Sequence, residues 1–228
     1  GESLSWIHQS ERILEDATTS NLEAFKLHSQ AVALAVSGRE LEAIPFEKRA
    51  VELDPNFAYA WSILSVTHFG TGRPSLAADY ATRAYGLRDR VSEFEQLRLA
   101  HRYHYLVIGD VNKAVEALLL QKRMYPQVST ASSDLAFTYY WSGQMDQAID
   151  EARESIALYP NFFASRLYLG LALLRMNRFA EAKEVLGKAI DQDIVHPDMR
   201  SALYQLAYIN SDAEGMHQQI EWARGRPD

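Results

Sequence analysis

Apolar residues in this chain recur every three or four positions rather than at every second one. In the stretch AYAWSILSVTHF, residues 58 to 69, aromatic and branched side chains fall at positions i, i+3, i+4 and i+7, which is the period of one face of an α-helix. Glycine and proline breaks separate such stretches every dozen residues or so. The pattern predicts an all-α chain with almost no strand.

One turn position recurs at a nearly constant interval. The aligned residues, whose numbers differ successively by 34, 37, 34, 34 and 34, are Gly38, Gly72, Gly109, Gly143, Asn177 and Ser211. The stretch Leu-x-Pro-Asn-Phe occurs twice, at 53 to 57 and at 158 to 162, an offset of 105, which is three intervals of 34 plus three. Self-similarity at this period predicts stacked helical units rather than a single globular core.

Small residues recur at fixed offsets from that turn, five positions on at Ala43, Ala77, Ala114, Ala148 and Ala182. With Trp61, Leu64 and Ala84 in the second unit, this pattern resembles the tetratricopeptide repeat, an antiparallel helix pair of the same period. The resemblance implies a right-handed α-solenoid of six such repeats plus an N-terminal helix. The expected divisions are a capping helix and linker at 1–20 and repeats at 24–57, 58–91, 92–128, 129–162, 163–196 and 197–228.

The three extra residues fall in the stretch 86 to 96, GLRDRVSEFEQ, for which we expect a longer loop between repeats 2 and 3. Ser92 and Glu95 have the spacing of a capping box, so the next helix is expected to begin there. Two residues depart from the family pattern in repeat 1. Pro45 lies inside a predicted helix, where it predicts a kink, and Glu47 occupies a position that is normally apolar or small.

The composition favours a soluble protein-binding segment. With 30 acidic against 23 basic residues, the net charge is -7, which gives no electrostatic footprint for nucleic acid. Apolar runs are too short to cross a bilayer, so no direct membrane insertion is expected. The absence of cysteine leaves the compartment open. The segment could be cytoplasmic, or extracytoplasmic if tethered to a membrane-spanning protein.

Catalytic chemistry is not predicted, and neither is a cofactor or a metal. His101 and His104, three positions apart and beside Arg98 and Arg102, are the nearest approach to a metal or acid-base cluster. Two histidines without a third ligand at matching spacing are a weak metal signal. The glycine-containing stretch FGTGRP, residues 69 to 74, lacks the preceding strand and the Gly-Lys-Ser/Thr ending of a phosphate-binding loop.

The resemblance also implies where a partner would bind, because the first helices of the family line a concave face through positions 2, 5, 9, 12 and 13. The residues singled out there are Phe25, His28, Tyr59, Phe69, Tyr103, Phe137, Tyr140, Trp141, Arg175 and Tyr208; the same positions include Leu171, Leu174, Gln205 and Ile209. With Arg175 as the only basic residue and no asparagine among these positions, the family's clamp on a C-terminal carboxylate is not supported.

We therefore expect an aromatic-lined groove for a peptide or a helix with bulky apolar anchors. Tyr140 and Trp141 are expected to be the most exposed of its rings. The alternative is that tight curvature brings these rings into contact with one another, so that they form core instead.

A narrower resemblance concerns biological context. Four parts of the chain resemble the C-terminal repeat portion of large bacterial signalling proteins, in which the array follows a protein kinase or a winged-helix domain. They are the opening (1 to 4 and 17 to 31) and the stretches 42 to 57, 88 to 105 and 204 to 227. This implies a sensory or regulatory fragment that binds a protein or peptide. The alternative is a self-assembly module, with a possible homodimer formed through the last repeat around Trp222 or through the surface of the insertion.

Overall fold

The computed structural model describes residues 19–36, 39–192, 194 and 196–224, and these residues form helices and no strand. In chain order the α-helices are α2 (Leu22–Val36), α3 (Glu40–Leu53), α4 (Ala58–Gly70), α5 (Pro74–Gly86), α6 (Glu93–Tyr103), α7 (Val111–Met124), α8 (Ser129–Trp141), α9 (Met145–Leu158), α10 (Phe163–Arg175), α11 (Phe179–Asp191), α12 (Pro197–Ile209) and α13 (Ala213–Ala223). A short 3₁₀-helix, η1 (Arg88–Arg90), precedes α6, and a π-helix, η2 (His104–Ile108), continues it.

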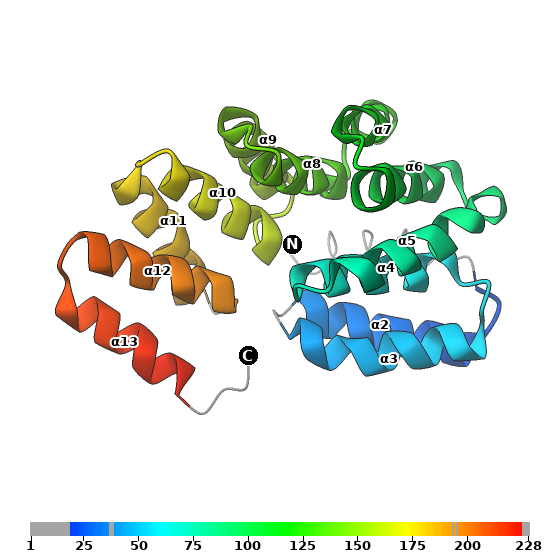
Figure 1. Cartoon of the computed structure of the whole chain (residues 1–228), viewed down its shortest axis with the longest axis horizontal. Coiled ribbons are helices and arrows are strands. Elements are labelled where there is room, and N and C mark those ends of the chain that lie inside the picture. The colour runs from blue at the N-terminus through cyan, green and yellow to red at the C-terminus, as the bar shows by residue number, and fades with distance from the viewer. Residues whose placement is uncertain (1–18, 37–38, 193, 195, 225–228) are drawn as a thin grey trace. The chain divides into compact units, whose positions relative to one another are not determined.

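Consecutive helices lie side by side in antiparallel pairs, as α4 and α5, α10 and α11, and α12 and α13 do in Figure 1. The fold is all-α and is an α-solenoid of helix pairs, which confirms the predicted class. Most of the predicted capping segment at 1–20 lies outside the described residues, as does the aligned turn residue Gly38.

The chain divides into two compact units. Unit 1 comprises Gly1–Ala35 and Glu40–Gln121, and unit 2 comprises Val36–Arg39 and Lys122–Asp228. Helices α3 to α6 thus belong to unit 1, and α8 to α13 belong to unit 2.

The same turn closes five of the helix pairs. Among the described residues, those with positive φ are Gly72 (71°), Gly109 (75°), Gly143 (84°), Asn177 (58°) and Ser211 (54°), which are the positions that the sequence alignment brought together. At Gly143, the next N–H, that of Gln144, donates to the carbonyl of Tyr139 five residues back, at 2.8 Å. Such a left-handed residue, most often glycine, lets the chain reverse while the last carbonyls of the helix keep a donor.

The three inserted residues are divided between two places, which corrects the expectation of a single longer loop. The first helices of the repeats begin at Ala58, Glu93, Ser129, Phe163 and Pro197. Their starts are 35, 36, 34 and 34 residues apart, where the regular interval is 34. One inserted residue therefore lies before the start of α6, and two lie after it. The π-helix accommodates part of this excess, because the N–H of Gly109 donates to the carbonyl of His104, five residues back, where an α-helical bond spans four. A π-turn takes up an additional residue without ending the helix. The predicted N-cap is present, since the side chain of Ser92 accepts the N–H of Glu95 at 3.3 Å.

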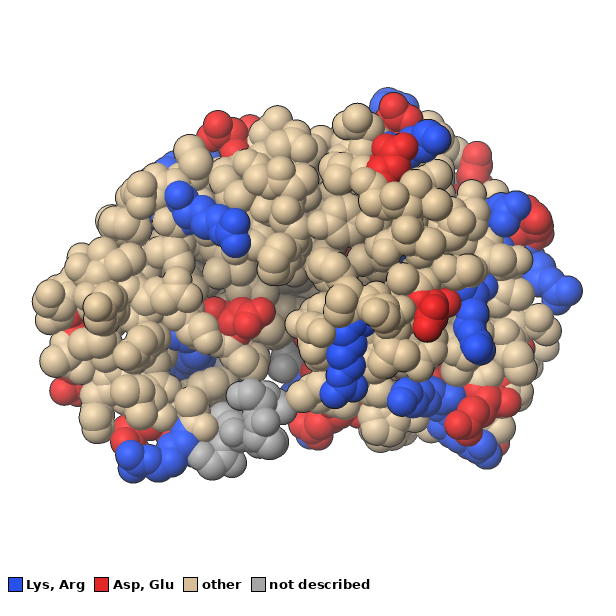
Figure 2. Space-filling view, viewed as in Figure 1, with Lys and Arg blue, Asp and Glu red and all other residues tan. Residues whose placement is uncertain are grey.

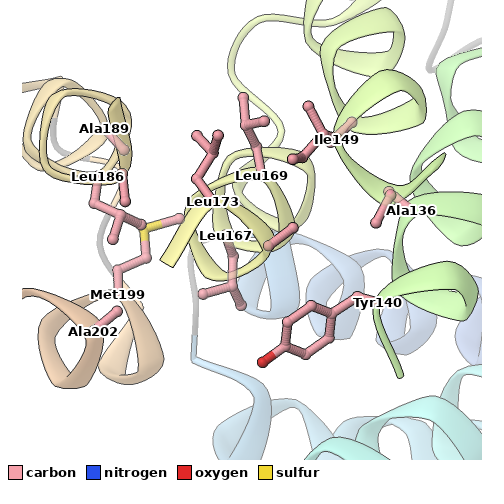
Figure 3. Packing of buried hydrophobic residues seen from close by; sticks show 14 of the residues in the cluster. Ala136, Tyr140, Ile149, Leu167, Leu169, Leu173, Leu186, Ala189, Met199 and Ala202 are labelled. Atoms are coloured by element: carbon pink, nitrogen blue, oxygen red, sulfur yellow. The ribbon is translucent and has the colours of Figure 1, made fainter. Parts of the chain in front are cut away.

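The core of unit 2 is apolar and closely packed. Figure 3 shows side chains of α8, α9, α10, α11 and α12 converging on Leu167, Leu173 and Leu186. Gly170 allows two helices to approach closely, because a Cβ added there would lie 2.5 Å from Cδ2 of Leu186. The buried Ser155 hydroxyl is 3.1 Å from the Ser129 carbonyl, to which it donates. The small residues of the repeat pattern are therefore needed because the helices lie too close together to accommodate larger side chains there.

The core of unit 1 includes charged groups. Nδ1 of His28 lies 2.8 Å from Oε1 of Glu47, and both side chains are almost completely buried. Burial raises the pKa of Glu47, and the hydrogen bond with His28 opposes that shift. Helix α3 continues through Pro45. The acidic residue at an unusual position is thus explained by a partner on the neighbouring helix α2.

Candidate partner-binding groove

The predicted groove residues divide evenly between the two units. Phe25, His28, Tyr59, Phe69 and Tyr103 lie on α2, α4 and α6 of unit 1, and Phe137, Tyr140, Trp141, Arg175 and Tyr208 lie on α8, α10 and α12 of unit 2. The two groups have different surroundings.

In unit 1 the predicted residues pack against their own neighbours. His28 is buried and meets the ring of Tyr59 edge-on at 5.1 Å. The hydroxyl of Tyr59 accepts a hydrogen bond of 2.7 Å from Arg98. The ring of Tyr103 stacks on Tyr85, with the centroids 4.2 Å apart. For these residues the alternative reading of the sequence, in which rings contact one another, describes the structure better than an open groove.

In unit 2 three successive first helices enclose a hollow of about 410 Å³. Its lining residues are Tyr140, Leu171, Leu174, Arg175, Asn177, Phe179, Gln205 and Ile209. All except Asn177 and Phe179 occupy positions 9, 12 or 13 of their repeats, which are positions that the family resemblance assigned to the concave face. The volume lies within the usual range for ligand pockets. Five of the eight lining residues are apolar or aromatic, and the other three, Arg175, Asn177 and Gln205, are polar.

Asn177 and Phe179 were missed by the sequence reasoning. Asn177 is the left-handed turn residue after α10, and Phe179 begins α11, so neither lies on a first helix. The concave-face positions of the family could not find them, because Asn177 is the turn residue itself and Phe179 stands two residues after it.

Tyr140 is buried, which corrects the prediction that it would be exposed. Its side chain is 5% exposed, because the Trp141 ring lies at 5.3 Å and the Arg175 guanidinium carbon lies 4.6 Å from its ring centroid. Figure 3 shows the ring beside Leu167, at the edge of the apolar cluster. Trp141, by contrast, is 52% exposed, as predicted. Tyr140 therefore lines the hollow as a buried residue, and Trp141 is an exposed neighbour that does not line it.

The groove carries one charge. Arg175 is the only ionisable group other than the Tyr140 hydroxyl among the lining residues. Its guanidinium lies over the face of Tyr140, a cation–π contact that holds the group in place. Beyond the hollow, the surface over α12 in Figure 2 is mostly uncharged, and Tyr208 and Ile209 are 69% and 48% exposed there.

No site for metal chemistry emerges from the part of the chain that the structure describes. There, no three or more His, Cys, Asp or Glu side chains come together in a group that could hold a metal ion. His101 is buried, and its ring faces that of Tyr105 at 6.1 Å. Within the described residues, no helix is both long and apolar enough to span a bilayer.

Comparison with protein families and known structures supports the repeat assignment. Residues 167–214, which include most of α10, all of α11 and α12, and the turn to α13, match the tetratricopeptide repeat family. The chain is similar to tetratricopeptide repeat proteins over this segment. A comparison with curated protein sequences finds no match.

Three solved structures extend the similarity to most of the chain. A thermophilic tetratricopeptide repeat protein of Thermus thermophilus has a TM-score of 0.56 and 21% identity, covering 79% of this chain and 98% of that one. PilW, described as a widely conserved type IV pilus biogenesis factor, has a TM-score of 0.55 and 13% identity, covering 91% and 94%. The Cut9–Hcn1 tetramer of the APC/C has a TM-score of 0.58 and 15% identity, covering 90% and 41%. At these identities the tetratricopeptide repeat relatives share the fold, and they leave the partner of this chain open.

Proposed function

We propose that this chain is a non-catalytic protein-interaction scaffold, whose groove in unit 2 binds a peptide or a helix with apolar or aromatic anchors. The observation that carries the proposal is the hollow itself, in which equivalent positions of α8, α10 and α12 line one surface. Apolar side chains on this surface are suited to the apolar face of a helix or to the bulky side chains of an extended peptide.

The exposed apolar residues at the groove supply the binding energy in this proposal. Trp141 is 52% exposed beside Tyr140, and Ile209 is 48% exposed on the wall. Full burial of a large apolar side chain contributes about 1.5–3 kcal/mol, and covering these half-buried ones would contribute roughly half of that each. A few such residues carry most of the affinity in protein interfaces, and tryptophan is enriched among them.

The test uses a matched pair of isoleucines. Ile209 and Ile220 are both 48% exposed, but Ile209 lines the hollow and Ile220 lies on α13 outside it. Random short peptides displayed on phage are selected against the wild-type chain, and their affinities are measured by fluorescence polarisation. We expect Ile209→Asp to weaken the selected peptides at least about tenfold and Ile220→Asp to leave them unchanged. Equal binding to both variants would contradict the proposal.

Self-assembly is a second candidate function, favoured by apolar surface on the last helix pair. Tyr204 on α12 and Ile220 on α13 are 37% and 48% exposed. Light scattering over a hundredfold concentration range is the test. A mass that rises toward a dimer, and falls back in Ile220→Asp, would favour a homodimer through this face. Trp222 is less suitable for mutation, because the Arg200 guanidinium lies over its ring at 5.2 Å and its loss would disturb the pair.

The signalling context is part of the same proposal. The resemblance of residues 42 to 57 and 88 to 105 to repeat portions of bacterial signalling proteins supports a role in which partner binding regulates an attached kinase or winged-helix domain. Immunoblotting of the native protein in its source cells tests this. A band no larger than the 228-residue chain would contradict it.

A further inference from the structure

Arg175 distinguishes this groove from a purely apolar one. The carbon of its guanidinium lies over the Tyr140 ring, 4.6 Å from the centroid. Attraction between the cation and the ring face holds the group without an oxygen acceptor for its N–H donors. The contact therefore leaves those donors available to a ligand.

Those donors are not engaged within the described part of the chain. There, no carboxylate forms an ion pair with Arg175, although exposed arginines nearby do have such partners, as Arg178 has in Glu181 at 2.7 Å. The side chain of Arg175 is exposed at the C-terminal end of α10, on the wall of the hollow. A planar donor group that is held in place and open to solvent is suited to a carboxylate, which it can bind through two parallel hydrogen bonds.

The remaining lining residues set what must lie beside that carboxylate. Leu171, Leu174, Phe179 and Ile209 form the apolar walls, and Asn177 and Gln205 add neutral amides. A second charged group in the ligand would have no counter-charge among these residues. The hollow thus pairs one anionic subsite with an adjoining apolar subsite.

We propose that the groove selects peptides in which an aspartate or glutamate side chain adjoins a bulky apolar residue, with Arg175 binding the carboxylate and the hollow taking the apolar side chain. This inference rests on the proposed function, since it names the chemistry of the peptide that the same groove binds. The proposed anionic group is a side-chain carboxylate, because Arg175 lines the same hollow as the apolar residues. An acidic side chain and a neighbouring apolar side chain of one peptide can therefore be bound together.

The experiment selects peptides from a random library fused through their C-termini to a phage coat protein, so that no peptide has a free terminal carboxylate. We expect the selected sequences to share Asp or Glu beside Leu, Phe or Trp. Replacing that acid with its amide should weaken binding to the wild-type chain about tenfold, as loss of a charge-assisted hydrogen bond does. The same replacement should have no effect on binding to Arg175→Gln. Raised salt should weaken wild-type binding and leave Arg175→Gln unaffected.

Two further variants separate recognition from stability. Arg175→Lys keeps the charge without the planar fork and should recover only part of the affinity. Arg153→Gln removes an exposed arginine on α9, outside the hollow, and should bind as the wild type does. Circular dichroism melting of each variant shows whether loss of the cover over Tyr140 has disturbed the fold.

The outcomes are distinguishable. Peptides that bind Arg175→Gln as tightly as the wild-type chain, but lose affinity for Ile209→Asp, would overturn this inference and leave the proposed groove standing. Peptides that bind Ile209→Asp as tightly as wild type would overturn both, as would a selection that enriches no sequence.

Discussion

Unit 1 buries charged side chains at places where unit 2 buries alanine, leucine and serine. In unit 1, Glu47, Glu95, Arg98 and Arg102 are each less than 8% exposed, whereas the buried groups described in unit 2 are apolar apart from Ser, Thr and His196. The same helix pair therefore tolerates two kinds of core. Buried charges require partners at fixed positions, and they add little net stability. An apolar core contributes more energy and depends on shape.

Breaking the buried pair of unit 1 is expected to have the largest effect. Glu47→Ala removes the partner of His28 and should lower the free energy of unfolding of unit 1 by about 3–5 kcal/mol. Hydrogen exchange of amides in α2 to α4 measures it, with α10 to α12 as internal reference. The matched control is Glu52→Ala on the same helix, whose carboxylate is 62% exposed.

A double replacement sharpens this prediction. If His28 and Glu47 both become leucine, neither residue of the pair leaves an unpartnered polar group at this site, and most of the lost stability should return. A double variant as unstable as Glu47→Ala would show that the loss in free energy of unfolding comes from the altered shape of this site rather than from an unpaired charge.

A core truncation in unit 2 should have the next largest effect. Leu186→Ala removes a completely buried side chain and should cost about 2–5 kcal/mol, through lost burial and the cavity left behind. Denaturant unfolding at pH 5 and pH 7.5 should give the same loss, because Leu186 packs within a cluster of apolar residues, which do not titrate. A loss that depends strongly on pH would break the contrast between the units.

Overpacking the same contact should cost less. Gly170→Ala places a methyl group 2.5 Å from Cδ2 of Leu186 and should destabilise unit 2 by about 1–3 kcal/mol. Gly187→Ala is the control, since a Cβ there meets nothing within 4 Å and should be neutral or stabilising in a helix. The double variant with Leu186→Ala should be less destabilised than the two single changes added together, because the new methyl enters the space that leucine leaves.

The smallest expected effect is a pH dependence confined to unit 1. His68 is completely buried, stacks on Tyr80 at 5.2 Å, and has no hydrogen-bond partner for either ring nitrogen within the described residues. Burial, together with the positive charges of Lys48 and Arg73, lowers its pKa. The unfolded chain then takes up a proton at a higher pH than the folded one, so stability is lost as the pH falls below about 6.5.

His68→Phe should remove that part of the acid sensitivity, because phenylalanine keeps the ring contact and cannot be protonated. Thermal melts of both proteins between pH 8 and pH 5 are the measurement. Parallel curves for the two proteins would show that other groups cause any acid sensitivity of unit 1.

Helix positions and turns were predictable from the sequence because both are local. The repeat requires one left-handed residue at the same turn of each helix pair, so aligning the repeats predicts where these residues lie. They are Gly72, Gly109, Gly143, Asn177 and Ser211. Small residues such as Ala148 and Ala182 follow in the same way, since helices that approach closely leave no room for larger ones.

What escaped prediction depends on neighbours in space. Tyr140 and Trp141 are adjacent in sequence, yet Tyr140 is buried under Arg175 of the following repeat, while Trp141 is not. The partner of Glu47 lies on another helix, 19 residues away. The division of the insertion around α6 was also hidden, because helix periodicity in the sequence does not show a π-turn.

The shared left-handed turn has a consequence for how such a chain can change its length. In unit 2, Gly143 and Asn177 occupy equivalent backbone positions one repeat apart, with φ of 84° and 58°. Excising the segment from 144 to 177 would join Gly143 directly to Arg178. Gly143 would then take the place of Asn177 as the left-handed residue before Arg178, so the chain would lose one repeat's worth of helices without needing a new turn. Gene duplication or deletion in this register can therefore alter the reach of the array while its local geometry stays the same.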